Sequence, residues 1–269
     1  MADTAIKDLE SYLRSMSSTL IDKCWWLDKI TPEIDTIIDF GCAGADLAIF
    51  VDRIFPGKYL YIGIDESPEM IKVAENNLKA HYSGKWYVVS DMAEASRKVG
   101  FRNAVLVLNS VLHEVFSYKS EREIWRLMFQ IQDIGFKYIA IRDMQYYRCK
   151  PDDLNTAAYA ISQSNDCDLW KQYHHIHATY NASGESDTEL QEFLLKYRYK
   201  ENWERESRET YVWDIFLSTE KYGIDDAYDT VFTQNFYIPF IHDKIKEDFG
   251  FDWDYPTHIK MLLKRKSEV

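Results

Sequence analysis

The stretch TIIDFGCAGAD, residues 36–46, decides the fold class of this chain. Its first five residues are mostly apolar, as in a buried strand, and they end at Gly41. A run of small residues follows, and residues 47–55 then show the spacing of an amphipathic helix up to Pro56. A buried strand, a tight turn and a helix in this order form the opening unit of a doubly wound α/β sheet.

The same alternation continues along the chain. Apolar runs predict further strands at residues 59–64, 86–89, 104–108, 137–141, 230–238 and 257–263. Helices are predicted from Pro68, over 92–98, over 121–134 and after Pro239. Strands that are apolar on both faces and separated by helices pair in parallel through right-handed crossovers. We therefore predict an α/β fold with a doubly wound, mostly parallel seven-stranded sheet.

The pattern also predicts how the chain is divided. Residues 147–228 have helical patterning and little strand signal, which indicates a helical insertion, or lid, between strands five and six. We expect a single domain over 1–269. Within it we expect an N-terminal helical cap over 1–31, a cofactor-binding core over 33–146, the insertion over 147–228 and C-terminal strands over 229–269 that complete the sheet.

Composition excludes several classes of protein. Lys and Arg number 32 against 44 Asp and Glu, and the net charge of −12 argues against a protein that coats nucleic acid with a broad basic face. No stretch approaches the ~20 apolar residues of a transmembrane helix, and the N-terminus has no apolar signal region. Four cysteines stand far apart without a CxxC pair. These features predict a cytoplasmic protein with no membrane partner.

Three successive predicted strands each end in an aspartate: Asp39, Asp65 and Asp91. The carboxyl ends of parallel strands meet at one edge of a sheet, where ligands bind in this class of fold. Asp39 can accept hydrogen bonds from an amine, and Asp65 is placed to accept both hydroxyls of a ribose. The small residues after Asp39 allow a ligand to approach the backbone closely. The alternative is a compact turn followed by acids that only cap helices.

Four segments carry a family resemblance: TIIDFGCAGADLA (36–48), YIGIDESPEMIKVAENNL (61–78), VVSDM (88–92) and VLVLNSVLHEV (105–115). Together they resemble the class I S-adenosylmethionine-dependent methyltransferases, over roughly residues 33–143 and, at the end of the chain, 257–265. In that family the first loop reads D-x-G-x-G-x-G and wraps the methionine half of the cofactor. Asp39 and Gly41 match this pattern, whereas Ala43 and Ala45 replace the later glycines. A nicotinamide dehydrogenase fits less well, because the G-x-G-x-x-G spacing is absent.

The resemblance implies S-adenosylmethionine as the cofactor. It implies that Asp65 binds the ribose hydroxyls and that Asp91 and Met92 flank the adenine. The full set of predicted cofactor-binding residues is Asp39, Gly41, Cys42, Ala43, Gly44, Asp65, Glu66, Met70, Asp91, Met92 and Asn109.

The segment after the fourth strand contains the predicted catalytic residues, Asn109 and His113. Asn109 could orient the sulfonium end or the acceptor, and His113 could remove a proton from the acceptor, since an unperturbed histidine titrates near pH ~6.5. The alternative is that both residues only help to start and pack a helix. Predicted substrate residues are Glu114, Arg142, Asp143 and Tyr146; Glu114 could instead hold the imidazole or cap the helix, and Arg142 and Asp143 could instead pair with each other.

Two further features of the sequence could form sites. The histidines His174, His175 and His177 invite a metal interpretation, but a metal site also needs further ligands, and we expect no functional metal. Residues 196–208 interleave aromatic and basic side chains, as in single-strand binders, yet three acids among them favour a solvated amphipathic helix. We predict a methyltransferase whose acceptor the sequence does not identify: a small molecule is slightly favoured, and a nucleic-acid base or ribose and a protein side chain stay open. The alternatives are therefore an RNA or DNA methyltransferase and a non-catalytic cofactor-binding module.

Overall fold

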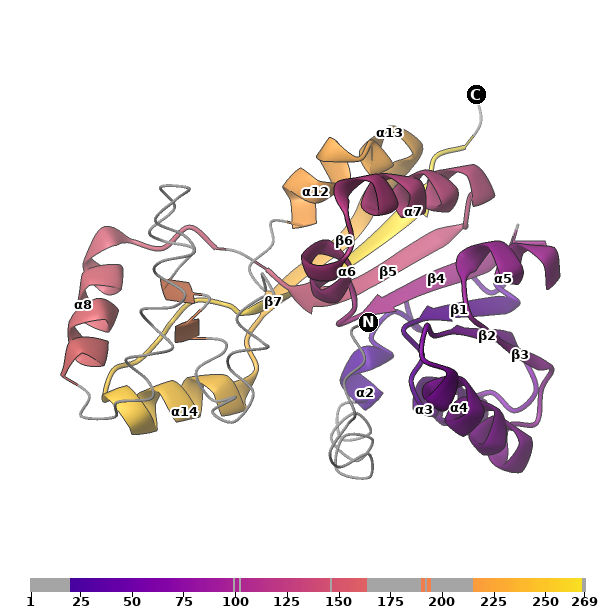
Figure 1. Cartoon of the computed structure of the whole chain (residues 1–269), viewed down its shortest axis with the longest axis horizontal. Helices are drawn as coiled ribbons and strands as arrows, with labels where there is room; N and C mark the ends of the chain where they lie inside the picture. The colour runs from indigo at the N-terminus through magenta and orange to yellow at the C-terminus, as the bar shows by residue number, and fades with distance from the viewer. Residues whose placement is uncertain are drawn as a thin grey trace.

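A computed structural model of the chain describes residues 20–98, 100–101, 103–145, 147–163, 190–191, 193–194 and 215–267 (Figure 1). The predicted N-terminal cap is described only from residue 20 onward, where α2 spans Leu20–Lys23. The histidine cluster at 174–177, the mixed-charge segment 196–208 and Tyr146 lie outside the described residues.

A seven-stranded sheet forms the centre of the molecule, in the order β3-β2-β1-β4-β5-β7-β6. β1 to β5 are parallel neighbours, and β7 runs antiparallel between β5 and β6. The predicted doubly wound, mostly parallel sheet of seven strands is therefore confirmed. The strands are β1 (Thr36–Phe40), β2 (Leu60–Ile64), β3 (Trp86–Val89), β4 (Ala104–Asn109), β5 (Tyr138–Met144), β6 (Tyr228–Phe236) and β7 (His258–Arg265).

Helices cover both faces of the sheet (Figure 1). Neighbouring strand residues point to opposite faces, so Ile37 packs into the core under α3 (Asp46–Ile54) and α4 (Pro68–His81). Ile38 packs into the core on the other face. That second core includes residues of α5 (Met92–Lys98), α6 (Leu112–Tyr118), α7 (Glu121–Ile134) and α13 (Ile224–Ala227), and α12 (Ile215–Lys221) precedes α13.

Local capping signals set the helix boundaries where the sequence predicts them. The Ser67 hydroxyl accepts a hydrogen bond from the Met70 N–H at 3.3 Å, and Pro68 occupies the first turn of α4. Ser120 and Glu123 form a reciprocal capping box at the start of α7, and Gly135 ends that helix with φ 69°. These helix ends depend on side chains within one turn, so they can be deduced without knowledge of the fold.

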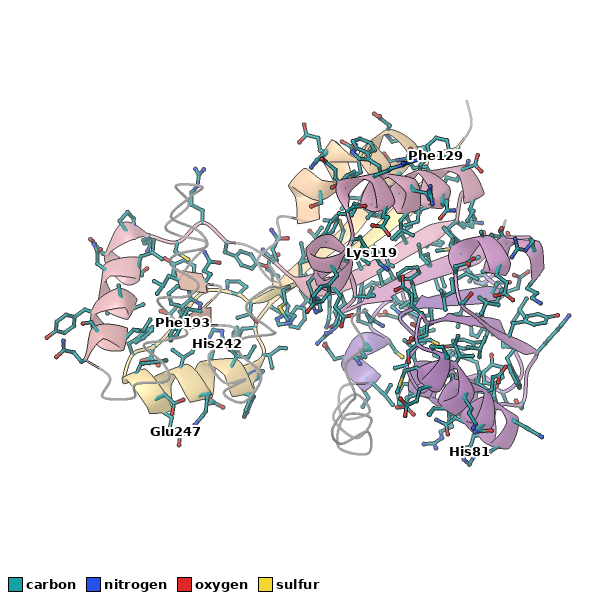
Figure 2. All side chains as sticks on the ribbon, in the orientation of Figure 1. His81, Lys119, Phe129, Phe193, His242 and Glu247 are labelled. Atoms are coloured by element: carbon teal, nitrogen blue, oxygen red, sulfur yellow. The ribbon has the colours of Figure 1, made fainter. Side chains whose placement is uncertain are left out.

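A third hydrophobic core lies apart from the sheet (Figure 1). It is built from the insertion, through α8 (Pro151–Ser162) and the residues Leu190, Phe193 and Leu194, and from α14 (Pro239–Phe249), which links β6 to β7. Figure 2 shows Phe193 and His242 in this lobe. The described residues of the insertion include the helices α8, α12 and α13, and the core that α8 forms also needs α14, which lies in the predicted C-terminal segment. No helix among the described residues has the length and apolar character needed to cross a membrane.

Gly41 provides a test of how tightly the loop after β1 is packed. A Cβ on Gly41 would lie 2.9 Å from Val111 Cγ2, and the residue has φ +79°. Gly250 has a similar φ of +75° with nothing within 4 Å, so Gly250→Ala measures the backbone cost alone, about 1–2 kcal/mol. We expect Gly41→Ala to lower the free energy of unfolding in urea by at least about 1 kcal/mol more than Gly250→Ala. Equal losses for the two variants would show that the contact with Val111 is not tight.

Candidate functional site

The loop after β1 adopts an unusual backbone conformation. Gly41, Ala43 and Ala45 all have positive φ, at 79°, 45° and 60°. A left-handed conformation costs a residue with a Cβ about 1–2 kcal/mol, so two alanines in it need compensation from the surrounding structure. The N–H groups of Gly41 and Cys42 both donate to the carbonyl of Ile64, at 2.8 and 3.0 Å. These bonds fasten the loop to the end of β2.

Gly63 explains how the loop can approach β2 so closely. A Cβ at this position would lie 2.7 Å from Cys42 Sγ. The Asn77 side chain of α4 holds the other side of the loop by donating to the carbonyl of Gly44 at 2.9 Å. Cys42 is itself buried, and burial raises the pKa of its thiol well above the usual range. The small residues predicted to cradle a ligand thus form a rigid, closely packed turn.

Asp39 lies at the end of β1, beneath this loop, and is 4% exposed. Its Oδ2 accepts a hydrogen bond from the Tyr61 hydroxyl at 2.9 Å. Burial raises the pKa of Asp39 to about 6, although the Tyr61 hydrogen bond and the charge of Lys23 act in the opposite direction. Lys23 is buried as well, and desolvation lowers the pKa of its ammonium. This edge of the sheet therefore holds two opposite charges away from water.

Asp65, at the end of β2, shapes the loop directly. Its Oδ2 accepts from the Ala43 N–H at 3.0 Å, and its Oδ1 accepts from the Ser67 N–H at 2.9 Å. Burial raises the pKa of Asp65, against the effect of these two bonds. A carboxylate offers about four acceptor positions, so two protein bonds leave capacity for a ligand's hydroxyl groups.

The remaining predicted cofactor residues lie around the ends of β2 and β3. Asp91 caps α5 by accepting from the Glu94 N–H at 2.7 Å, and its side chain is exposed. Met70 and Met92 are buried in the molecule, at 4% and 2% exposure, and Met92 belongs to the core that also holds Val89. Glu66 forms an ion pair with Lys119, with 2.6 Å between Oε1 and Nζ. Asp91 and Met92 thus also perform the structural roles of a cap and a core residue.

Asn109 ends β4 and is 9% exposed. Its Nδ2 donates to the carbonyl of Lys23 at 3.3 Å, whereas its buried Oδ1 has no hydrogen-bond partner among the described residues. The next residue, Ser110, has φ 53°, a strained conformation for a residue with a side chain. A buried unpaired acceptor beside a strained residue is typical of a binding site rather than of a packed core.

His113 and Asp143 form a buried pair at the start of α6. His113 Nδ1 lies 2.7 Å from Asp143 Oδ1, and Asp143 Oδ2 accepts from the N–H groups of Val111 and Leu112 at 3.1 and 2.7 Å. Burial alone would raise the pKa of Asp143, but the nearby His113 and the hydrogen bonds that the carboxylate accepts hold it below the usual range. Asp143 therefore holds the imidazole and caps the helix. Glu114 lies in the first turn of α6 and is half-buried.

Arg142 pairs with Asp22 rather than with Asp143. Its Nε lies 2.6 Å from Asp22 Oδ2, and its Nη1 donates to the Ser110 hydroxyl at 3.1 Å. The other oxygen of Asp22 accepts from Lys260 Nζ on β7. Arg142 and Lys260 both lie over the ring of Phe236, at 5.3 and 4.6 Å from its centroid. The predicted substrate residue Arg142 thus belongs to a cluster at the ends of β5 and β6 and the start of β7.

Sequence reasoning missed several residues of this site: Asp22, Lys23, Tyr61, Gly63, Phe236 and Lys260. Two signals were available. Lys260 is a charged residue between the apolar residues Ile259 and Met261 of a strand. Gly63 interrupts an apolar run, which often marks a close approach of another backbone. Among the described residues, no three His, Cys, Asp or Glu side chains converge in a way that could hold a metal ion.

Because the pKa of Asp39 is raised, the free energy of unfolding should depend on pH. An aspartate in the unfolded chain has a pKa near ~3.9. As pH rises from about 4 to 6, the unfolded chain therefore loses the Asp39 proton more readily than the folded protein, and the free energy of unfolding falls. We expect Asp39→Asn to be more stable than wild type by on the order of 2 kcal/mol at pH 7, with no gain near pH 4. Urea unfolding at both pH values measures this; a variant that is less stable at pH 7 contradicts the assignment.

The Asp143–His113 pair makes the opposite prediction. A carboxylate with a lowered pKa stabilises the fold above its unfolded pKa, and this contribution is lost as pH falls. We expect Asp143→Asn to lose about 2–4 kcal/mol of unfolding free energy at pH 7, because the variant leaves His113 and the start of α6 poorly paired. The loss relative to wild type should shrink toward pH 3. A loss below about 1 kcal/mol at pH 7 would show that the pair is not an important cap.

Comparisons with known proteins agree on the fold. No family model matches the sequence, and no curated protein matches it. Among solved structures, an O-methyltransferase family protein from Burkholderia thailandensis is 13% identical with a TM-score of 0.50, and the match covers 97% of this chain and 59% of that one. The chain therefore spans less than two thirds of that protein.

Two further structures were matched. A SAM dependent methyltransferase from Aquifex aeolicus is 9% identical with a TM-score of 0.47, over 96% of this chain and 98% of that one. The plantazolicin methyltransferase BamL, solved in complex with a triazolic desmethylPZN analog and SAH, is 10% identical with a TM-score of 0.45, over 97% of this chain and 100% of that one. The seven-stranded sheet, together with the match at a TM-score of 0.50 to the O-methyltransferase family protein, confirms the predicted class I methyltransferase type of fold.

Proposed function

We propose that this protein binds S-adenosylmethionine at the carboxyl ends of β1 to β4 and transfers its methyl group to an acceptor. The observation that carries the proposal is the set of acceptors at these strand ends, which the fold itself does not require. Buried Asp39, buried Asp65 and Asn109, whose Oδ1 has no hydrogen-bond partner in the described part of the chain, stand at the ends of three neighbouring strands. The fold supports the same function, because it is the fold of the class I methyltransferases.

The chemistry of these acceptors fits the cofactor. The carboxylate of Asp39 suits an ammonium group, and that of Asp65 suits a ribose diol. Gly41 and the left-handed turn that follows it stand at the carboxyl ends of β1 and β2, where ligands bind in this class of fold. Lys23, beside Asp39, supplies a positive charge for a carboxylate. The groups match an amino acid joined to a nucleoside.

The residues of the chain would act mainly by orientation. The cofactor, when bound, supplies a methyl group activated by a sulfonium. Asn109 would orient the reacting groups through its unpaired Oδ1, since alignment is the main requirement of an in-line displacement. Asp143 holds Nδ1 of His113, so Nε2 is the nitrogen that would accept a proton from the acceptor. Asp143 is then a positioning residue, and no substrate contact is needed from it.

The acceptor in this proposal is a small molecule, in a cytoplasmic protein. The net charge of −12 disfavours a nucleic-acid polymer as the acceptor. A nucleic-acid methyltransferase and a module that binds the cofactor without turnover are the alternatives. Transfer of labelled methyl groups to fractionated cell extract distinguishes them: label in nuclease-sensitive material supports the first alternative, and binding without any transfer supports the second.

Cofactor binding is tested by calorimetry with S-adenosylmethionine and with S-adenosylhomocysteine. We expect Asp65→Asn to bind both ligands about 10–100-fold more weakly than wild type, because charged hydrogen bonds to the ribose are lost. Asp52→Asn is the matched control. Asp52 is also buried and also accepts backbone hydrogen bonds, from Gly57 and Ser83, but it lies near the far end of α3. No binding by wild type, or equal losses for both variants, would refute the proposal.

A further inference from the structure

We propose that Arg142 and Lys260 form a binding site for the carboxylate or phosphate of a small acidic acceptor, and that Asp22 occupies this site in the structure described here. The proposal deepens the proposed function and rests on it for the identification of the ligand as the methyl acceptor. Its basis is the unequal charge of the cluster, in which two cations share a single carboxylate.

The two cations are fixed in the sheet. Arg142 and Lys260 are directly paired residues of β5 and β7, and their side chains are 5% and 11% exposed. The ring of Phe236 supports both cations, and the Ser110 hydroxyl accepts from Arg142. A guanidinium and an ammonium held side by side on an aromatic ring are arranged to bind an anion with two or three oxygens.

The carboxylate is the replaceable part of the cluster. Asp22 belongs to a helix of only four residues, Leu20–Lys23, and its side chain is 35% exposed. Burial alone would raise the pKa of Asp22, but hydrogen bonds and charge from Lys260 and Arg142 hold it below the usual range. Asp22 is therefore a charged carboxylate that reaches the cations from the edge of the site, as the carboxylate of a ligand would.

The position of the cluster points to the acceptor. Asn109 pairs with Arg142 across β4 and β5, so the unpaired Oδ1 proposed to orient the reacting groups lies next to the cation pair. An anionic group held by Arg142 and Lys260 would place the rest of a small molecule beside Asn109. Charge-assisted hydrogen bonds to a buried pair of this kind give both affinity and orientation.

Burial favours a small molecule over a nucleic-acid backbone. Nucleic-acid polymers are gripped by exposed basic stripes that neutralise several phosphates. Here both cations are nearly buried and are compensated by a single carboxylate. Such a site accepts one anionic group at the position that the Asp22 carboxylate occupies, and it does not follow a chain of phosphates.

The first experiment measures anion binding without any methyl transfer. Thermal unfolding is recorded with inorganic phosphate and with acetate, at an ionic strength held constant with chloride. Asp22→Asn leaves the two cations without their carboxylate, so we expect this variant to unfold at a lower midpoint temperature, which both anions restore. Its apparent affinity for each anion should be at least about 10-fold higher than that of wild type. Adding Arg142→Met to this variant should abolish the response.

Asp28→Asn is the matched control. Asp28 also pairs with a lysine in the same segment, Lys29, but its side chain is 76% exposed. We expect this variant to respond to anions as wild type does. If Asp22→Asn responds no more strongly than Asp28→Asn, the cluster is an ordinary structural ion pair and the proposal is wrong.

The second experiment identifies the acceptor class. The protein is incubated with cell extract and with S-adenosylmethionine that carries a labelled methyl group, and the products are separated by anion exchange. We expect the label in small acidic compounds. Lys260→Met should raise KM for the acidic acceptor at least about 10-fold, while the cofactor affinity measured by calorimetry stays unchanged. Label in neutral compounds or in nuclease-sensitive polymer overturns the proposal. If wild type does not bind the cofactor, the proposed function fails, whereas the anion response still decides the binding site.

Discussion

Close contact between Cys42 and Gly63 determines where the loop after β1 can lie, and the rest of the site depends on that position. Only a residue without a Cβ at position 63 lets the Cys42 side chain pack against β2. The loop then reaches the carbonyl of Ile64 with two N–H groups and the carboxylate of Asp65 with a third. These bonds offset the free-energy cost of the two alanines in a left-handed conformation. The loop after β1 is therefore held by tertiary contacts and not by the conformational preference of its own residues.

Charges buried at the same edge have the opposite effect on stability. Asp39, Lys23, Arg142 and Lys260 are all withdrawn from water, and each such charge costs free energy unless it is well paired. Buried charged side chains are found in binding sites in spite of this free-energy cost, because they are already desolvated and oriented when a ligand binds. A site of low dielectric constant also strengthens every electrostatic contact within it. The buried charges at the carboxyl edge of the sheet therefore lower the stability of the free protein, as the proposed binding site would require.

Sequence patterns predicted the parts of the structure that depend on near neighbours. Ser67 and Pro68 start α4, and Gly135 ends α7, because the atoms involved lie within a few residues. The strand-end aspartates were found for the same reason. The cluster around Asp22 could not be found in this way: its partners stand 120 and 238 residues away, and only the insertion of β7 between β5 and β6 brings them together. The packing of α14 against α8 could not be predicted from the sequence either, because α8 precedes β6 in the chain and α14 follows it.

The helical lobe formed by α8 and α14 is continuous with the ends of β5 and β6 and the start of β7 (Figure 1). A hinge movement of this lobe would be a tilt about the row of strand ends to which it is joined. Arg142, Phe236 and Lys260 stand in that row. They lie on the axis of the tilt, where displacement is smallest, so the distances among them are the ones that such a movement changes least.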